Sequence, residues 1–200
     1  MGLSPAVPGL CLAFAAMALL IFASVTPPAW DKVNFLHATT SAGRVVYGVF
    51  GYCIEGGACS HRSEGYNLEL PGADNVVLNS KVLHNLTYTL ILHPIAGGLA
   101  FFALVFGLLG ASCASRVATI FAALTAGFAA LVTLVIFVID MVLWNVLKNR
   151  IQDAGYSAGL GNANWFTVGA FVALCAAMCT SFCGAFGRFA EGRFAGEKVS

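Results

Sequence analysis

The sequence predicts an all-α membrane protein, a bundle of four transmembrane helices with a small disulfide-stapled extracellular β-sheet in its first loop. Three observations lead to this fold class. Of the 200 residues, 59% are hydrophobic and only 10% are charged, and the mean hydropathy is +0.85. Four apolar segments are each long enough to cross a bilayer. Two cysteines lie six positions apart in the one long polar segment. We therefore expect residues 1–200 to form a single tetraspan domain.

The four spans are expected at about residues 9–26, 86–110, 117–147 and 165–186. The chain has 10 basic and 9 acidic side chains, and of these Asp140 alone falls inside a predicted span. A charge in hydrocarbon costs about 2.5 to 3.5 kcal/mol, so this distribution is typical of transmembrane helices. Phe22-Ala23-Ser24 resembles a signal-peptide cleavage site, but no basic segment precedes the first span, and we expect a retained helix.

Four spans place both termini on one face, which we predict to be cytoplasmic together with a turn at 112–116 and a tail at 187–200. The extracellular face then carries loops at 27–85 and 148–164. Basic residues are divided between the two faces and therefore indicate little about the orientation of the chain. The paired cysteines favour placing the first loop outside the cytosol, where thiols are oxidised. Three tryptophans fall where spans meet the loop side and predict an interface belt there: Trp30, Trp144 and Trp165.

The first loop is predicted to form strands. Residues 33–39 and 44–50 are rich in β-branched and aromatic side chains, and Ser41-Ala42-Gly43 between them favours a hairpin turn. A third strand is expected to carry Cys59. A Cys53–Cys59 bridge would then staple a thin sheet and contribute roughly 2 to 3 kcal/mol in the chain-entropy model.

Several short motifs occur in an order that is typical of one family. They are Gly48-Val49-Phe50-Gly51-Tyr52-Cys53, Cys59, Gly65-Tyr66, Leu92-His93-Pro94-Ile95-Ala96, Phe137-Val138-Ile139-Asp140 and Trp165-Phe166-Thr167. In these motifs the chain resembles the fungal Sur-seven/PalI family over nearly its whole length, and the PalI branch most closely. The resemblance implies the claudin-like plan, in which a cysteine-stapled extracellular sheet lies between the first two of four helices.

The resemblance also implies a plasma-membrane protein without catalysis of its own. In the PalI branch such a protein assists the surface localisation of a seven-span receptor for ambient alkaline pH. In the Sur-seven branch it marks stable plasma-membrane domains and supports cell-wall organisation. About fourteen residues follow Phe186, where many PalI proteins carry a long polar tail. This difference favours a compact subunit that acts through its spans and outer sheet.

The second span is predicted to continue a helix that begins outside the membrane. After Pro71-Gly72, Asp74 is expected to cap a helix running from Asn75 into the span. Pro94 lies inside this helix, where it frees the carbonyl of Leu90. We therefore expect a kink at Pro94.

The second and third spans each carry one polar residue at a similar depth. His93 and Asp140 are about five to eight residues from the outer ends of their spans, or roughly 8 to 12 Å at 1.5 Å per residue. We expect them to form an intramembrane polar pair, because an imidazole relieves the cost of a lone carboxylate. Two interpretations stay open. The pair is either an interhelical hydrogen bond that specifies packing, which we favour, or a proton-responsive element.

Cysteines near the opposite face form a stripe on the fourth span at Cys175, Cys179 and Cys183. Close packing of small residues is the favoured interpretation, and Cys113 and Cys183 are candidates for acylation. No histidine lies near this stripe, and we predict neither a metal site nor a cofactor. The sequence has no phosphate-binding glycine loop or nucleophile elbow, and its net charge is only +1. We expect neither an enzyme nor a nucleic-acid-binding protein.

The sequence thus favours a non-catalytic accessory or scaffold protein of the plasma membrane. Its expected partners are a larger integral membrane protein or further copies of itself, with lipids around the spans. The alternatives are a claudin-like self-associating barrier or pore component, and an auxiliary subunit of a membrane pump or polysaccharide synthase. One acidic residue in four spans is little support for ion conduction or transport.

Overall fold

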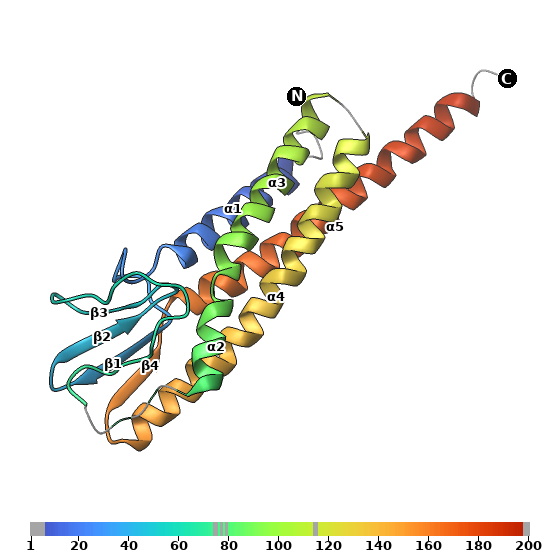
Figure 1. The fold of residues 1–200 in the computed structure, drawn as a ribbon. Coiled ribbons are helices and arrows are strands. Elements are labelled where there is room, and N and C mark those ends of the chain that lie inside the picture. Colours follow the sequence, from blue (N-terminus) through green and yellow to red (C-terminus); the bar gives the residue numbers. More distant parts are fainter. Residues whose placement is uncertain (1–6, 74–75, 77, 79, 114–115, 198–200) are drawn as a thin grey trace.

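The computed structural model describes residues 7–73, 76, 78, 80–113 and 116–197, with the backbone alone for Arg116 and residues 184–197. The helices in this part of the chain are α1 Val7–Ser24, α2 Lys81–Thr89, α3 Leu92–Ser112, α4 Arg116–Asp153 and α5 Ala163–Glu197. The strands are β1 Leu36–Thr40, β2 Gly43–Tyr47, β3 Tyr52–Ile54 and β4 Ser157–Leu160. The sheet lies at one end of the helices, and the start of α1 and the end of α5 lie at the other (Figure 1).

Four stretches of helix are long and apolar enough to cross a membrane, as the sequence predicts. They are Val7–Ser24, Lys81–Ser112, Val117–Asp153 and Ala163–Cys183. Large apolar side chains such as Phe14, Phe101 and Phe128 are exposed on these helices, where lipid tails would solvate them. The protein is therefore a multi-pass membrane protein with a claudin-like four-helix bundle.

Small side chains fill the contacts between the helices. α1 packs against α3 and α5, and α4 packs against the same two helices. The inner cluster, which we define as the buried core within the bundle, consists mostly of alanine and leucine: Ala16, Leu20, Ala96, Ala100, Ala129, Ala130, Ile136, Ala170 and Leu174. A Cβ on Gly127 would lie 2.8 Å from the sulfur of Met178, so the glycine permits close approach of α4 and α5. Such contacts stabilise helices in lipid, where burial of apolar surface gives little advantage.

The sheet has the antiparallel order β3-β2-β1-β4. The predicted hairpin is present as β1 and β2, with Thr40 opposite Gly43, and Gly43 has a φ of +116° that favours glycine after the tight turn. The third strand differs from the prediction, because β3 carries Cys53, and Cys59 forms only an isolated bridge to it. The fourth strand comes from the second loop and pairs Leu160 with Leu36, which the sequence analysis did not predict.

The sheet and the bundle share one core. The outer cluster, which we define as the buried side chains between the sheet and the helices, includes Phe35, Tyr47, Trp144, Leu147 and Ile151. The last three belong to α4, which continues to Asp153 instead of ending near residue 147. α4 is therefore longer than its membrane span, and its last turns support the sheet.

The helix expected from Asn75 begins instead at Lys81. Ser80 caps it, because its side-chain oxygen accepts a hydrogen bond from the backbone N–H of Leu83 at 3.4 Å. The predicted cap, Asp74, and Asn75 lie outside the described residues.

The predicted kink takes the form of an interruption just before Pro94. α2 ends at Thr89 and α3 begins at Leu92, with a short turn at Leu90 and Ile91. Proline has no N–H to donate to the carbonyl of Leu90, and the backbone N–H of His93 donates to it instead at 3.1 Å. Figure 1 shows α2 and α3 following one another along the same side of the bundle.

Candidate functional site

A buried polar pair lies where α3 begins and α4 passes beneath the sheet. His93 is in the first turn of α3, and Asp140 is in α4. The Nε2 atom of His93 lies 3.1 Å from Oδ2 of Asp140, and both side chains are fully buried. The structure thus brings together the two residues that the sequence analysis placed at equal depth.

The interruption before Pro94 fixes the tautomer of His93. The carbonyl of Leu90 lies 3.0 Å from Nδ1 of His93 and accepts hydrogen bonds only, so Nδ1 carries a hydrogen. On the other side of the ring, Nε2 faces Oδ2 of Asp140. An imidazolium with a carboxylate and a neutral imidazole with a carboxylic acid both fit this contact, and both are neutral overall.

The contact between the two side chains is close but not ideally aligned. Its distance is that of a hydrogen bond, whereas its angles are not, and Oδ1 of Asp140 has no hydrogen-bond partner among the described residues. Small rotations of the two side chains would align them without moving the helices.

Aromatic rings cover the pair on the side of the sheet. The ring of Phe35 meets that of His93 edge to face at 5.1 Å and stacks on Trp144 at 5.6 Å. Along the helices, Leu90 and Leu143 belong to the outer cluster, and Ala96 and Ile136 belong to the inner cluster. The pair therefore ties α3 to α4 at the boundary between the two clusters. No substrate can reach side chains with 0% exposure, so this arrangement is suited to specifying packing.

Three asparagines join the two loops above the pair. The side-chain amide of Asn164 donates to the carbonyl of Phe35 at 2.8 Å, and that of Asn162 donates to the carbonyl of Lys32 at 3.2 Å. The backbone N–H of Asn34 donates to the side-chain oxygen of Asn162 at 3.1 Å. The sequence analysis missed this contact, for which the spacing Asn162-Ala163-Asn164 before the fourth span was the available signal.

The predicted tryptophan belt needs one correction. Trp30 and Trp165 are 39% and 74% exposed, as expected for side chains at an interface. Trp144 is fully buried in the outer cluster. It points toward the sheet because α4 continues beyond its span, so Trp144 lies in the protein core instead of facing lipid.

The cysteines divide between the two ends of the molecule. Cys53 and Cys59 form a disulfide, as predicted, and Cys53 is buried in the sheet. Both candidates for acylation, Cys113 and Cys183, are exposed and carry free thiols, and their acylation stays a prediction. The remaining free cysteines are Cys11, Cys175 and Cys179. Among the described residues, no three His, Cys, Asp or Glu side chains are placed to hold a metal ion.

Tyrosine hydroxyls hold the segment that follows the disulfide. Tyr47 donates to the carbonyl of Glu69 at 2.7 Å, and Tyr52 donates to the Glu69 carboxylate at 3.0 Å. Tyr66 donates to the carbonyl of Gly48 at 2.9 Å. Burial, followed by neighbouring tyrosines, raises the pKa of Tyr47 and of Tyr66, so both hydroxyls keep the hydrogens that they donate. An open pocket of about 390 Å³ lies beside Tyr52, Tyr66 and Glu69.

Comparison with known families gives one match over most of the chain. A family model described as the SUR7/PalI family matches residues 6–183. This range contains all four spans, the sheet and the buried polar pair. No curated protein shows significant similarity to the chain.

Proposed function

Because the chain belongs to the SUR7/PalI family, we propose that it is a non-catalytic accessory protein of the plasma membrane that binds a larger membrane protein. In this proposal it localises or stabilises that partner. Both termini are in the cytoplasm, and the sheet is extracellular, where its disulfide persists.

The observation that carries the proposal is an outer face built from both loops and fixed at several points. The disulfide bridges the β3 side of the sheet, and β4 pairs with β1 on the other side. Asn164 ties the start of α5 to the carbonyl of Phe35, and the outer cluster joins the sheet to α4. A preorganised surface loses little conformational entropy when a partner binds, which favours a recognition role.

The finer proposal is a PalI-type role. The partner would then be a seven-span receptor for ambient alkaline pH, and the protein would assist its delivery to the cell surface. The resemblance of the motifs, from Gly51-Tyr52-Cys53 to Trp165-Phe166-Thr167, supports this choice. The Sur-seven-type role in membrane domains and cell-wall organisation would instead require a partner from those systems.

Affinity purification of the full chain in mild detergent tests the proposal. We expect a larger membrane protein to co-purify at a fixed stoichiometry, and its identification distinguishes the two finer roles. A monodisperse lone monomer would contradict partner binding, and a homo-oligomer alone would support the barrier-type alternative. Antibody access to terminal tags in intact and permeabilised cells tests the location of the termini.

A matched pair of variants separates the outer sheet from the rest of the molecule. Replacing Cys53 and Cys59 by serine should reduce co-purification, because the disulfide that staples the sheet is lost. Replacing Cys113 and Cys183 by serine removes two free cysteines at the other end and should leave co-purification intact. Equal effects of the two double variants would contradict recognition through the sheet.

A further inference from the structure

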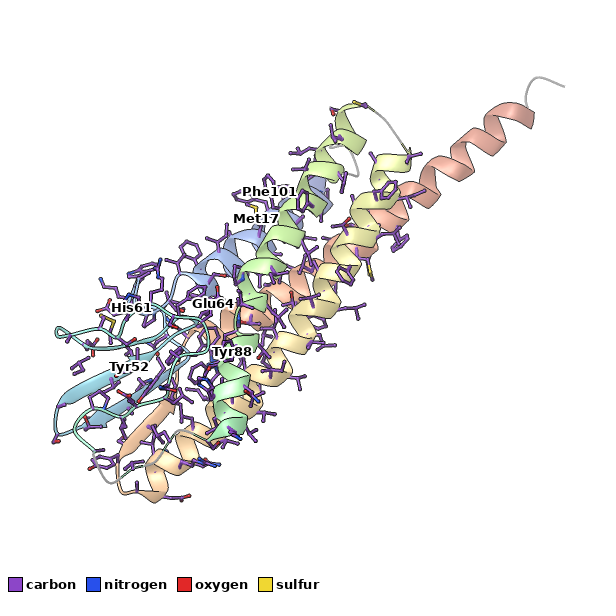
Figure 2. The ribbon with its side chains drawn as sticks, viewed as in Figure 1. Met17, Tyr52, His61, Glu64, Tyr88 and Phe101 are labelled. Carbon is purple, nitrogen blue, oxygen red and sulfur yellow. A yellow bond between two sulfur atoms is a disulfide. The ribbon has the colours of Figure 1, made fainter. Side chains whose placement is uncertain are left out.

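A second pocket opens between the sheet and α2. It has a volume of about 510 Å³ and is lined by Phe50, Arg62, Ser63, Glu64 and Tyr88. It contains one cationic and one anionic side chain beside two aromatic rings. Figure 2 shows Glu64 and Tyr88 close together where the sheet meets the helices.

The backbone around this pocket is well held. The N–H of Ser63 donates to the carbonyl of Phe50 at 3.0 Å. Gly65, at a φ of +62°, lies directly against the ring of Tyr88, and a Cβ there would overlap the ring. Arg62 is positioned over the ring of Phe50, with 5.9 Å from its guanidinium carbon to the ring centroid.

The two charges in the pocket are not neutralised by each other. Among the described residues, the ion pairs within 4.0 Å are Arg44–Glu55 and His93–Asp140, so neither includes Arg62 or Glu64. Arg62 and Glu64 are both exposed. The pocket thus offers a positive and a negative group to one ligand.

Helix lengths place the pocket at the membrane surface. α1 has 18 residues and α3 has 21, or roughly 27 and 32 Å at 1.5 Å per residue, close to the roughly 30 Å of hydrocarbon in a bilayer. α2 is far less apolar than α3, so within the stretch Lys81–Ser112 we place α3 alone in the hydrocarbon. The end of α1 and the start of α3 then mark the headgroup region on the sheet side. The position of Trp30 agrees with this placement of the headgroup region, because its exposed ring lies 6.1 Å from the ring of Phe22 in the last turn of α1.

Both walls of the pocket lie next to the headgroup region. On one side, the N–H of Val49 donates to the side chain of Thr26 at 2.8 Å, so the residue before Phe50 is bonded to the segment that directly follows α1. On the other side, Tyr88 is half exposed near the end of α2, four residues before α3 begins. A lipid headgroup in the same leaflet lies within reach of both walls.

We propose that the pocket of Phe50, Arg62, Ser63, Glu64 and Tyr88 binds the headgroup of a zwitterionic phospholipid from the leaflet on the sheet side. The guanidinium of Arg62 binds the phosphate, and the carboxylate of Glu64 binds the ammonium group. The ring of Tyr88 adds a cation–π contact to the ammonium group.

The helices beneath the pocket offer a path for the acyl chains. Figure 2 places Met17 of α1 and Phe101 of α3 along the bundle, farther from the sheet than Glu64 and Tyr88. The two helices are packed against each other, and Phe101 is exposed. Acyl chains lying along α1 and α3 would therefore meet apolar side chains directly below the headgroup.

Native mass spectrometry of the full chain in detergent tests the proposal. The probes are dioleoylphosphatidylethanolamine, dioleoylphosphatidic acid, dioleoylglycerol and inorganic phosphate. We expect phosphatidylethanolamine to bind best, and Arg62→Gln to weaken its binding about fivefold. Glu64→Gln should weaken the binding of phosphatidylethanolamine by a similar factor. It should leave the binding of phosphatidic acid unchanged, because phosphatidic acid has no ammonium group.

The chain supplies a matched control in an exposed pair elsewhere on the sheet. Arg44 and Glu55 lie 3.6 Å apart and do not line the pocket. Arg44→Gln and Glu55→Gln should leave phosphatidylethanolamine binding unchanged, and losses as large as those of the pocket variants would overturn the proposal. Melting temperatures of all four variants are compared to confirm that each is folded.

The other probes decide what is recognised. Equal binding of dioleoylglycerol would overturn headgroup recognition, because that lipid has neither phosphate nor amine. Binding of inorganic phosphate with the affinity of the lipid, and with the same dependence on Arg62, would show a free-anion site and overturn the lipid proposal. Inorganic phosphate should instead bind at least tenfold more weakly, because it lacks the groups that contact Glu64 and the helices.

Discussion

Replacing Asp140 by alanine is expected to destabilise the protein far more than replacing it by asparagine. In Asp140→Ala, Nε2 of His93 stays fully buried without a partner, since its other nitrogen already donates to Leu90. A buried unsatisfied acceptor costs about 1 to 3 kcal/mol, and a small cavity adds about 1 kcal/mol more. The free energy of unfolding should therefore fall by roughly 2 to 4 kcal/mol.

Asparagine can supply the hydrogen that the pair needs. Because Nδ1 of His93 is the donor to Leu90, neutral Nε2 is an acceptor, and the side-chain amide introduced by Asp140→Asn donates to it. The two side chains have nearly the same volume, so the cost should stay within about 1 kcal/mol. His93→Ala should cost more, roughly 3 to 5 kcal/mol, because it also removes the contact with Phe35 and leaves a buried carboxyl group.

The assay is denaturant unfolding of the full chain in detergent, followed by tryptophan fluorescence. Thr133→Ala is the control, because this buried hydroxyl donates at 2.7 Å to the Ala129 carbonyl of its own helix. A double-mutant cycle between His93→Ala and Asp140→Ala should give a coupling of about 1 to 3 kcal/mol. Coupling below about 0.5 kcal/mol, or equal losses in Asp140→Asn and Asp140→Ala, would refute this account.

Three further predictions concern the sheet and its support. Cys53→Ser should lower the free energy of unfolding by about 2 to 3 kcal/mol, and wild type treated with reductant should match the variant in the same unfolding assay. Trp144→Ala should cost roughly 3 to 5 kcal/mol because the ring is fully buried, whereas Trp165→Ala, 74% exposed, should cost less than about 1 kcal/mol; similar losses would contradict the placement of these rings. Burial, and then the Arg44 guanidinium, lower the pKa of His37, with partial compensation by a nearby carboxylate, so the unfolded chain binds the proton more readily. Stability should therefore fall as the pH drops through about 6.5, and His37→Gln should reduce that fall when melting temperatures are compared between about pH 7.5 and 5.5.

Much of the fold follows from local signals in the sequence. Continuous apolar runs predict the four spans, and the β-branched segments around Gly43 predict the hairpin. The position of β4 did not follow, because Ser157-Ala158-Gly159-Leu160 has little strand propensity and pairs only through contacts with β1. The end of α4 was also missed, since its final turns are held by the sheet and not by lipid.

The parts of the candidate site that could be predicted are those for which the depth of a residue along its helix determines its contacts. His93 and Asp140 belong to two neighbouring spans, and their similar distance from the span ends brings them together. Trp144 was misplaced by the same reasoning, because depth gives no information on which way a ring points. The Asn164 contact to Phe35 joins residues far apart in the chain, and the spacing Asn162-Ala163-Asn164 marks the donors without indicating their partners.

The pairing of β4 with β1 sets an order for assembly of the chain. β1 leaves the ribosome with the first loop, whereas β4 follows only after α4 has been synthesised. Until then one edge of β1 is an open strand edge, which other chains can pair with. Completion of the sheet therefore requires the second loop to lie on the same side of the membrane as the first. A truncation before Ser157 should therefore leave this edge of β1 open.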